Sequence, residues 1–539
     1  MRAAGADDPM WKKRIQGPPE EAGVRIPDAA DRRGIPDEWN EVHVESVRKK
    51  ARRQIVFTAL MFVALFAGMT VFFCRYAILR KSELFDNDYN SRDLLLEEHN
   101  RRGRILAAGG EELAYSDEDN NRYYPYDTLF CHAVGFSALG GSGIEEYMKY
   151  ELLHSDIPFS SKLACDREEI RYPGNDVTTT LDLDLQSYAW EALGDLRGAV
   201  IVTEPSTGKI LAMVSKPDFD PNGIEAQWEY YRTDQSGNAV LLNRATQGVY
   251  PPGSTFKIVD AVELLQEDPS AIYDFSFDCD DGIYENGEES IHCFQNEYGA
   301  YEVHHQQNLA QAFAHSCNSA FAKIVTEDLD EDRFRKTLER MYFDKPLPYD
   351  LPCAESSSQL LEDRDISVHN LMQVAIGQGT TQVSPLHMNM ITMAVANGGV
   401  LMRPYMVDHV STAEGDLLQQ YNPRQAGTLM DGETAYMVRQ LMRAVTEVAY
   451  DEETGMDVWG TASEFNDTQN YIAFGKTGTA EFGDDEDSHA WFTGFTVDAE
   501  DSEDGDPQLC ITVLVENGGV GSDKAVPIAK QILDRWYGQ

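Results

Sequence analysis

Three short segments place serine, lysine and amide side chains at spacings that suit acyl transfer through a serine. They are Ser254-Thr255-Phe256-Lys257, Ser316-Cys317-Asn318 and Lys476-Thr477-Gly478-Thr479. Patterns this short also arise by chance, as in Ser46-Val47-Arg48-Lys49 and Ser206-Thr207-Gly208-Lys209. The surrounding sequence therefore has to decide which of these segments can carry chemistry.

The first segment stands where a helix is expected to begin. Tyr250-Pro251-Pro252-Gly253 comes before Ser254, and an apolar run over residues 256–265 follows it. A serine in a first helical turn lies near unpaired N–H groups and the positive end of the helix dipole. Lys257 shares its helix face, so an amine neutralised by burial could take the serine proton. The alternative is a serine cap beside an exposed lysine.

The second segment lies in a stretch of mostly small and apolar residues, 309–321. This stretch predicts a helix start, with Asn308 as a candidate cap. We interpret Ser316 as a proton shuttle and Asn318 as a holder of the substrate amide. The alternative is a pair of buried polar side chains that satisfy each other's hydrogen bonds.

The third segment follows residues 471–475, an aromatic and β-branched run that is typical of a strand. Gly475 and Gly478 would permit the close approach of another backbone. A strand edge that carries Lys476 and two hydroxyl groups suits a bound peptide carboxylate. The alternative is an exposed hairpin strand without a function.

Together and in this order, the three segments resemble the active site of penicillin-binding transpeptidases, and the likeness runs from about residue 121 to the end. Further similar segments are Arg197–Val202, Glu204–Ser215, Asn243-Arg244-Ala245, Gly377-Gln378-Gly379, Ser384-Pro385-Leu386, Asn397-Gly398-Gly399 and His489–Gly494. The chain is similar to class B penicillin-binding proteins, most of all to short forms of the penicillin-binding protein A type. This resemblance implies an α/β (α+β) fold like that of the serine β-lactamases, with a five-stranded antiparallel sheet, flanking helices and a helical subdomain.

The resemblance also implies a role for each residue of the three segments. Ser254 is expected to be the nucleophile, Lys257 its general base, Ser316 the relay of a proton to the leaving amine, and Asn318 the residue that orients Lys257 and the substrate amide. Lys476, Thr477, Gly478 and Thr479 are expected to bind the terminal carboxylate, and the backbone N–H groups of Ser254 and Thr479 to form the oxyanion hole.

The expected activity is D,D-transpeptidation of peptidoglycan stem peptides, blocked by β-lactams that acylate the same serine, with no cofactor. A membrane glycosyltransferase of the shape, elongation, division and sporulation family is the expected partner. Two enzyme alternatives are a D,D-carboxypeptidase and a β-lactamase, although the Glu-x-x-Leu-Asn motif of class A β-lactamases is not found between Asn318 and Lys476. A non-catalytic β-lactam sensor or scaffold is a third alternative.

Residues 55–74 form an uncharged and mostly apolar run of the length that spans a bilayer. Basic residues crowd the preceding positions 48–53, so the amino terminus should stay in the cytoplasm and the catalytic part outside it. We expect a disordered tail over residues 1–54, an anchor over 55–74, a small membrane-proximal pedestal domain over 75–175 and a transpeptidase domain over 176–539.

Charge and cysteine content exclude some functions. The net charge is −46, and residues 55–539 hold 33 Lys and Arg against 81 Asp and Glu, which argues against nucleic-acid binding. No His and Cys residues show the spacing of a zinc site, so no metal is expected. Cys279 and Cys293 flank an acidic loop in the exterior part, where they form either a disulfide or two free thiols.

Overall fold

The computed structural model describes residues 37–79, 92–233, 237–295, 300–451, 456–481 and 487–538. The chain divides into two compact units, Met1–Leu84 and Phe85–Gln539. Residues 1–36 of the predicted tail and 80–91 of the predicted pedestal lie outside the described residues.

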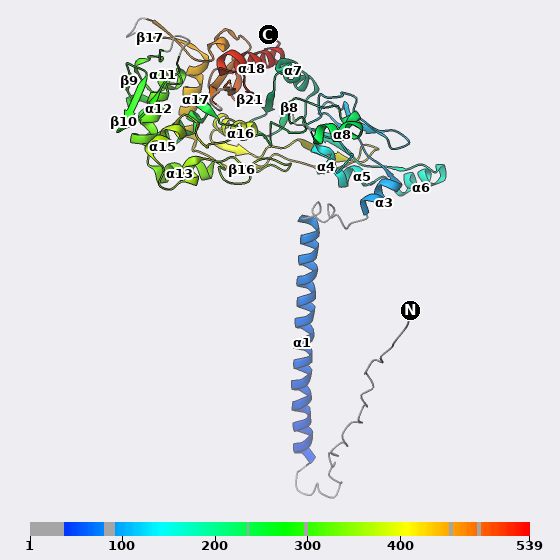
Figure 1. Ribbon diagram of the computed structural model, residues 1–539. Coiled ribbons are helices and arrows are strands. Elements are labelled where there is room, and N and C mark those ends of the chain that lie inside the picture. Colours follow the sequence, from blue (N-terminus) through cyan, green and yellow to red (C-terminus); the bar gives the residue numbers. More distant parts are fainter. Residues whose placement is uncertain are drawn as a thin grey trace, which may run out of the picture. The chain divides into compact units, whose positions relative to one another are not determined.

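The first unit contains one long helix, α1 (Asp37–Leu79) (Figure 1). Its part Glu45–Phe73 has a mean hydropathy of 2.4 in its most apolar window and is the one helix among the described residues long and apolar enough to cross a membrane. The helix starts well before the apolar run. The prediction of a disordered tail over residues 1–54 is therefore wrong for residues 37–54. A helix that has formed extends at little cost, and the Glu45–Lys49 pair on adjacent turns supports the extension.

The second unit is built, as expected, on an antiparallel sheet of five strands, whose order is β19-β20-β21-β7-β8. Its strands are β7 (Gly198–Thr203), β8 (Ile210–Lys216), β19 (Tyr471–Ala480), β20 (His489–Asp498) and β21 (Pro507–Val515). Nearly all of their residues are buried, which requires cover on both faces. The strand that carries Lys476-Thr477-Gly478-Thr479 is β19, at one edge of this sheet.

Helices cover both faces of the sheet. Thr493 of β20 bonds Thr392 of α16 (Pro385–Ala396), whereas Thr496 bonds Tyr537 of α18 (Gly521–Tyr537). Because positions an odd number apart point to opposite faces of a strand, α16 and α18 lie on opposite sides. Figure 1 shows these helices around β21, with α17 (Gly432–Thr446) beside α16 and α7 (Leu183–Leu193) beside α18.

A second sheet, of six strands in the order β15-β14-β6-β2-β3-β4, crosses the domain boundary that we proposed at residue 175. Strands β2 (Ile105–Leu106), β3 (Glu112–Ser116) and β4 (Arg122–Tyr123) come from the membrane-proximal segment, and β6 (Asp176–Thr179), β14 (Val407–Ser411) and β15 (Leu417–Gln420) from the catalytic part. The two parts are therefore joined by backbone hydrogen bonds within one compact unit.

The helices that carry the first two motif segments pack into one apolar core. They are the short 3-10 turn η2 (Gly253–Phe256), α9 (Lys257–Glu267), α11 (Leu309–Ala314) and α12 (Asn318–Lys323). Phe256, Phe313 and Phe321 are fully buried among them. Between α9 and α11 the chain makes two hairpin-like pairs, β9 (Phe277–Cys279) with β12 (His305–Gln307), and β10 (Ile283–Asn286) with β11 (Glu289–His292).

The remaining described elements are short. The other α-helices are α3 (Arg92–His99), α4 (Gly143–Tyr147), α5 (Lys149–Leu153), α6 (Phe159–Glu168), α8 (Ile224–Arg232), α10 (Ala271–Asp274), α13 (Glu331–Arg340), α14 (Gln359–Glu362) and α15 (Val368–Ala375). The other strands are β1 (Asn100–Arg101), β5 (Tyr172–Pro173), β13 (Val400–Met402), β16 (Gln425–Thr428), β17 (Val448–Asp451) and β18 (Met456–Trp459).

Candidate active site

The nucleophile segment is one tight turn, η2, that leads directly into α9. The predicted helix start is confirmed, with the regular α-helix beginning at Lys257, three residues after the half-buried Ser254. Gly253 has a φ of +53°, and a β-carbon there would lie 2.6 Å from the backbone oxygen of Thr479. Glycine at this position therefore allows the nucleophile segment and β19 to come together.

Lys257 is fully buried, and its amine joins the first two segments. Nζ donates to Ser254 Oγ at 3.1 Å, to the Ser316 backbone oxygen at 2.6 Å and to Asn318 Oδ1 at 2.7 Å. Burial lowers the pKa of Lys257 to about 8. A neutral amine at this place can accept the proton of the serine hydroxyl. The alternative of an exposed lysine is wrong.

The second segment is a sharp turn between α11 and α12. Asn308 caps α11, as predicted, and Cys317 caps α12. Between the two helices Ser316 adopts a φ of +59°, a left-handed backbone that is uncommon outside glycine and holds its side chain in a fixed direction. Ser316 Oγ accepts a hydrogen bond from Lys476 Nζ at 2.9 Å. This hydroxyl therefore lies between the amines of Lys257 and Lys476, 3.4 Å from the former.

Asn318 has both ends of its amide bonded to other protein groups. Oδ1 accepts from Lys257, and Nδ2 donates to the backbone oxygen of His292 at 3.1 Å. An amide held at both ends cannot flip or swing away, so Oδ1 stays directed at the lysine amine. The geometry therefore fits the expected role of Asn318 in orienting Lys257, while its Nδ2 is directed at the His292 backbone.

The third segment brings a second buried lysine to the same hydroxyl. Lys476 is fully buried, and its Nζ donates to Ser316 Oγ and to the Thr477 backbone oxygen at 3.3 Å. Burial, and secondly the charge of Lys257, lower the pKa of Lys476 well below its usual value. Two amines that share one hydroxyl in an apolar setting do not both stay charged. The alternative of an exposed hairpin strand is wrong for this part of β19.

Gly478 of this strand lies against the nucleophile segment, whereas the hydroxyls beside it bond other parts of the chain. A β-carbon at Gly478 would lie 3.0 Å from the backbone oxygen of Pro252, so the predicted close approach of another backbone is confirmed there. At Gly475 the nearest group is instead the ring of Phe492, 2.5 Å from such a β-carbon. Thr477 Oγ1 bonds Thr461 Oγ1 at 2.7 Å, and Thr479 Oγ1 accepts from the backbone N–H of Gly521 at 3.3 Å. All three motif segments therefore meet at one place, as their order along the chain suggested.

A buried ion cluster behind the nucleophile segment was not predicted from the sequence. Glu516, at the end of β21, accepts from Arg244 Nε at 2.7 Å and from Tyr250 Oη at 2.7 Å, and pairs with Arg197 at 2.7 Å. Arg244 is only 1% exposed. Asn243-Arg244-Ala245 had been noted only for its resemblance, and nothing in the sequence around Glu516 marks it as a partner.

A cluster of cysteines and a histidine adjoins the second segment, and in it Cys279 and Cys293 are two free thiols, one of the two alternatives that the sequence left open. Cys279 and Cys293 lie with their sulfur atoms 3.9 Å apart and unbonded. His304 and Cys317 complete a group that could hold a metal ion, although we found no zinc-like spacing and expected no metal. The four residues come from four separate places between β9 and α12, and spacing rules detect only ligands that are close in sequence.

Comparison with known proteins shows that this chain is similar to penicillin-binding proteins. Residues 198–534 match the family described as the penicillin binding protein transpeptidase domain. The chain is 31% identical over 513 residues to the peptidoglycan D,D-transpeptidase PbpA of Mycolicibacterium smegmatis, covering 89% of this chain and 97% of that protein.

Solved structures show the same similarity. Penicillin-binding protein A from M. tuberculosis, in a ceftriaxone acyl-enzyme complex, has a TM-score of 0.69 and 28% identity, covering 81% of this chain and 98% of that chain. The D,D-transpeptidase domain of a peptidoglycan glycosyltransferase from Eggerthella lenta has a TM-score of 0.68 and 30% identity, with 81% and 99% covered.

Proposed function

The chain belongs to the penicillin-binding protein transpeptidase family, and on that premise we propose the residue roles by which it works as a peptidoglycan D,D-transpeptidase. It is a serine acyltransferase of peptidoglycan stem peptides and a β-lactam target. The proposed roles rest mainly on the buried amine of Lys257. This amine donates hydrogen bonds to Ser254 Oγ, the Ser316 backbone oxygen and Asn318 Oδ1.

In the acylation step, Ser254 Oγ attacks the carbonyl carbon between the two terminal D-alanine residues of a stem peptide. The hydroxyl proton passes to the neutral amine of Lys257 as the new C–O bond forms. The backbone N–H groups of Ser254 and Thr479 are assigned to the developing oxyanion, which the closeness of Gly253 to the Thr479 backbone supports. Donors of this kind are typically worth about 2.7–4 kcal/mol each.

Release of the last D-alanine breaks the C–N bond, and the leaving nitrogen needs a proton. Ser316 Oγ lies between both lysine amines, so it can pass a proton from Lys257 to that nitrogen. An amine of a neighbouring strand then attacks the ester through the same groups in reverse. A β-lactam forms the same ester, and we expect it to hydrolyse slowly.

Substrate carboxylate binding is assigned to the edge of β19. Thr477, Gly478 and Thr479 lie along this edge strand, where Thr479 is partly exposed, while Lys476 lies fully buried behind Ser316. A bound carboxylate would favour the charged form of Lys476, because an opposite charge offsets the cost of burial. Lys476 therefore acts through its charge rather than as an exposed anchor.

Membrane attachment and a partner follow from the rest of the chain. Helix α1 is assigned as the single anchor, with the basic residues 48–53 on the cytoplasmic side and the catalytic unit outside. The chain is assigned to work beside a separate membrane glycosyltransferase of the shape, elongation, division and sporulation family. That partner would make the glycan strands whose peptides this enzyme cross-links.

Covalent labelling with a fluorescent penicillin tests the nucleophile. Ser254→Ala should remove the label from the purified full chain while the folded structure, followed by circular dichroism, is kept. Ser206→Ala is the matched control, because Ser206 is exposed and begins a Ser-x-x-Lys sequence in the same unit. Labelling that survives in Ser254→Ala would overturn the assignment.

A further inference from the structure

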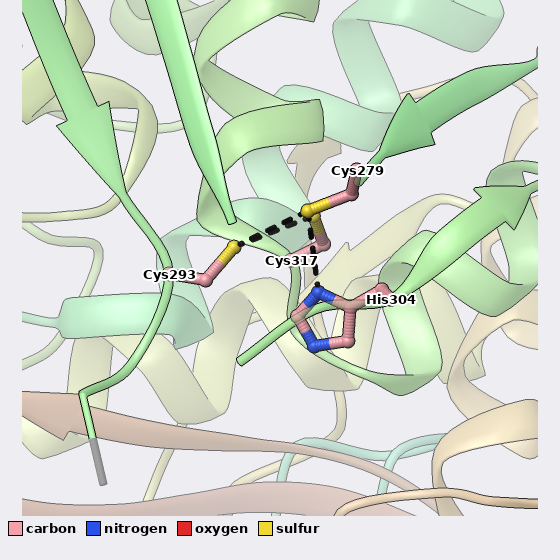
Figure 2. A group of neighbouring side chains, drawn as sticks. All are labelled: Cys279, Cys293, His304 and Cys317. Carbon is pink, nitrogen blue, oxygen red and sulfur yellow. Dashed lines mark hydrogen bonds between the residues drawn. The ribbon is translucent and has the colours of Figure 1, made fainter. Parts of the chain in front are cut away.

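Four side chains with metal-binding atoms converge next to the second motif segment (Figure 2). They are Cys279 at the end of β9, Cys293 just after β11, His304 just before β12, and Cys317 at the start of α12. One ligand atom from each lies within 4.8 Å of all the others. Figure 2 shows the three sulfur atoms and the imidazole directed toward one another.

Three of the six distances between the ligand atoms match a tetrahedron of metal ligands, and all six are within 4.8 Å. Two sulfurs about 2.3 Å from a tetrahedral zinc lie about 3.8 Å from each other, and a sulfur and an imidazole nitrogen about 3.6 Å. The cluster has 3.9 Å for Cys279 to Cys293, 3.6 Å for Cys293 to Cys317, and 3.6 Å for Cys279 to His304 Nδ1. A disulfide would join only two of these groups, at about 2.05 Å, and would leave the other two without a role.

The histidine is already oriented as a metal ligand. Its Nδ1 faces the sulfur of Cys279, and its Nε2 lies 3.7 Å from a carboxylate oxygen of Glu302. Metal-bound histidines usually donate their second ring N–H to a carboxylate or carbonyl, which fixes the tautomer and the ring direction. The ring also stacks on His315, with 5.3 Å between centroids.

We propose that Cys279, Cys293, His304 and Cys317 bind one Zn²⁺ ion as a tetrahedral structural site. The three cysteines are at most 2% exposed, so the site is closed and offers its four protein ligands without a position for a reacting water. Three thiolates and a neutral imidazole around Zn²⁺ give a net charge of −1, and the three thiol protons are released on binding.

The metal ligands flank the groups that hold Asn318. Cys317 is its chain neighbour, and Cys293 follows His292, whose backbone oxygen accepts from Asn318 Nδ2. One ion would thus fix the two backbone segments between which the amide is held. The proposal of a metal site does not depend on the proposed catalytic roles. The expected effect of the metal on acylation through Lys257 does depend on them.

Metal content of the purified full chain tests the site. We expect about one zinc per chain by mass spectrometry of metals, the content of a single closed site. Cys293→Ser should lose most of the zinc, and Cys353→Ser, which lies outside the cluster, should keep it. A wild-type chain that stays free of zinc after zinc loading, with Cys279 and Cys293 linked in a disulfide, would overturn the proposal.

Two further measurements remain informative even if the variants that lack a metal ligand do not fold. Replacing zinc by Co²⁺ in the wild-type chain should give the intense visible bands of tetrahedral cobalt and a thiolate charge-transfer band; weak octahedral bands would count against the site. Glu302→Gln, at a largely exposed position, should weaken zinc affinity about 10–100-fold, as for other second partners of metal-bound histidines; unchanged affinity would refute the assigned role of Glu302.

Penicillin labelling of the same samples tests separately whether the metal binds and whether it affects acylation. Chelation should slow labelling in parallel with zinc loss, and added zinc should restore it. Bound zinc with labelling that chelation leaves unchanged would support the site and overturn its link to Asn318. If the chain binds zinc and the Ser254→Ala variant is still labelled by penicillin, the metal site is supported and the proposed nucleophile is contradicted.

Discussion

Lys257 shows how burial turns an ordinary lysine into a base. Its amine is surrounded by acceptors that hold its position, yet the apolar core around it favours the neutral form. The hydrogen bonds fix direction and the burial sets the pKa, which is about 8. Both are needed, because a base must point at the proton and also be free to take it.

The rate of acylation should therefore depend on pH through Lys257. The neutral amine is the active form, so acylation by a β-lactam should rise as pH increases through about 8 and level off above it. Lys257→Arg stays charged at accessible pH and should lower the rate about 10²–10⁴-fold. Labelling rates between pH 6 and 9.5 check both.

Lys209→Arg is the matched control for this experiment, since Lys209 ends the Ser-x-x-Lys sequence that begins at Ser206. It should label at the wild-type rate. A wild-type rate that stays constant across this pH range would show that a different group limits acylation.

At the scale of single residues, the sequence predicted the reactive side chains but not the residues that surround and support them. Residues of the three segments could be predicted, because each pairs a reactive side chain with a recognisable helix start or strand. Glu516 could not, because its partner Arg244 is far away in the chain, and His304 could not, because its spacing from the three cysteines matches no recognised ligand pattern. Burial, which makes Lys257 a base, is likewise a property of the packed core.

Among the elements, the approach of η2 to its neighbours depends on glycine. Gly377 has a φ of +67°, and a β-carbon there would lie 2.1 Å from the backbone oxygen of Gly253. Gly253 also donates its N–H to the Gly377 oxygen at 2.9 Å. The nucleophile turn is thus seated directly on the loop after α15.

Gly377→Ala should push this turn away and remove most penicillin labelling. The control is Gly398→Ala, which has a similar φ of +62° but open space around it. The control should lose only the roughly 1–2 kcal/mol of a left-handed alanine and keep its labelling. Equal labelling in the two variants would show that the contact with Gly253 does not matter.

The end of β21 supports the same turn through a charge cluster. Burial alone would raise the pKa of Glu516, but Arg244, Tyr250 and Arg197 outweigh it and lower that pKa. Glu516→Gln leaves Arg244 buried without its charge partner and should destabilise the fold by about 3–5 kcal/mol. Chemical denaturation at pH 7 measures this, with Glu229→Gln in the exposed Glu229–Arg232 pair as a control of small effect.

The same cluster links stability to pH with a definite sign. A carboxylate with a lowered pKa in the folded state stabilises it above the unfolded pKa, about 4.3 for Glu. That contribution is lost as pH falls through the folded pKa. The wild-type advantage over Glu516→Gln should accordingly shrink below about pH 4.3; an advantage that grows in acid would contradict the ion cluster.

The strands of the main sheet were predictable from their apolar runs, and their antiparallel order followed the resemblance. The turn at Ser316 and the helical start of α1 at Asp37 were not predictable. The turn at Ser316 depends on contacts with β19, and the start of α1 depends on extension of a helix into residues whose composition is typical of a tail. In both places the neighbouring structure overrides the local propensity of the sequence.

For the whole molecule, the proposed topology gives a simple protease experiment. Protease added to intact protoplasts should digest the unit that begins at Phe85 and spare an epitope fused before Met1, because the basic residues 48–53 hold that end inside. Disrupted protoplasts are the control, in which the epitope should also be lost. A catalytic unit that survives in intact cells would reverse the orientation.

The six-stranded sheet also bears on how this protein can be divided. Strand β6 pairs with β2 on one side and with β14 on the other. Separation of the chain before residue 176 would remove β2 and leave β6 with a bare row of backbone donors and acceptors. Such an unpaired edge recruits strands from other molecules and promotes aggregation. A soluble fragment for crystallisation or inhibitor screening should therefore begin before α3 rather than at the start of the transpeptidase sequence.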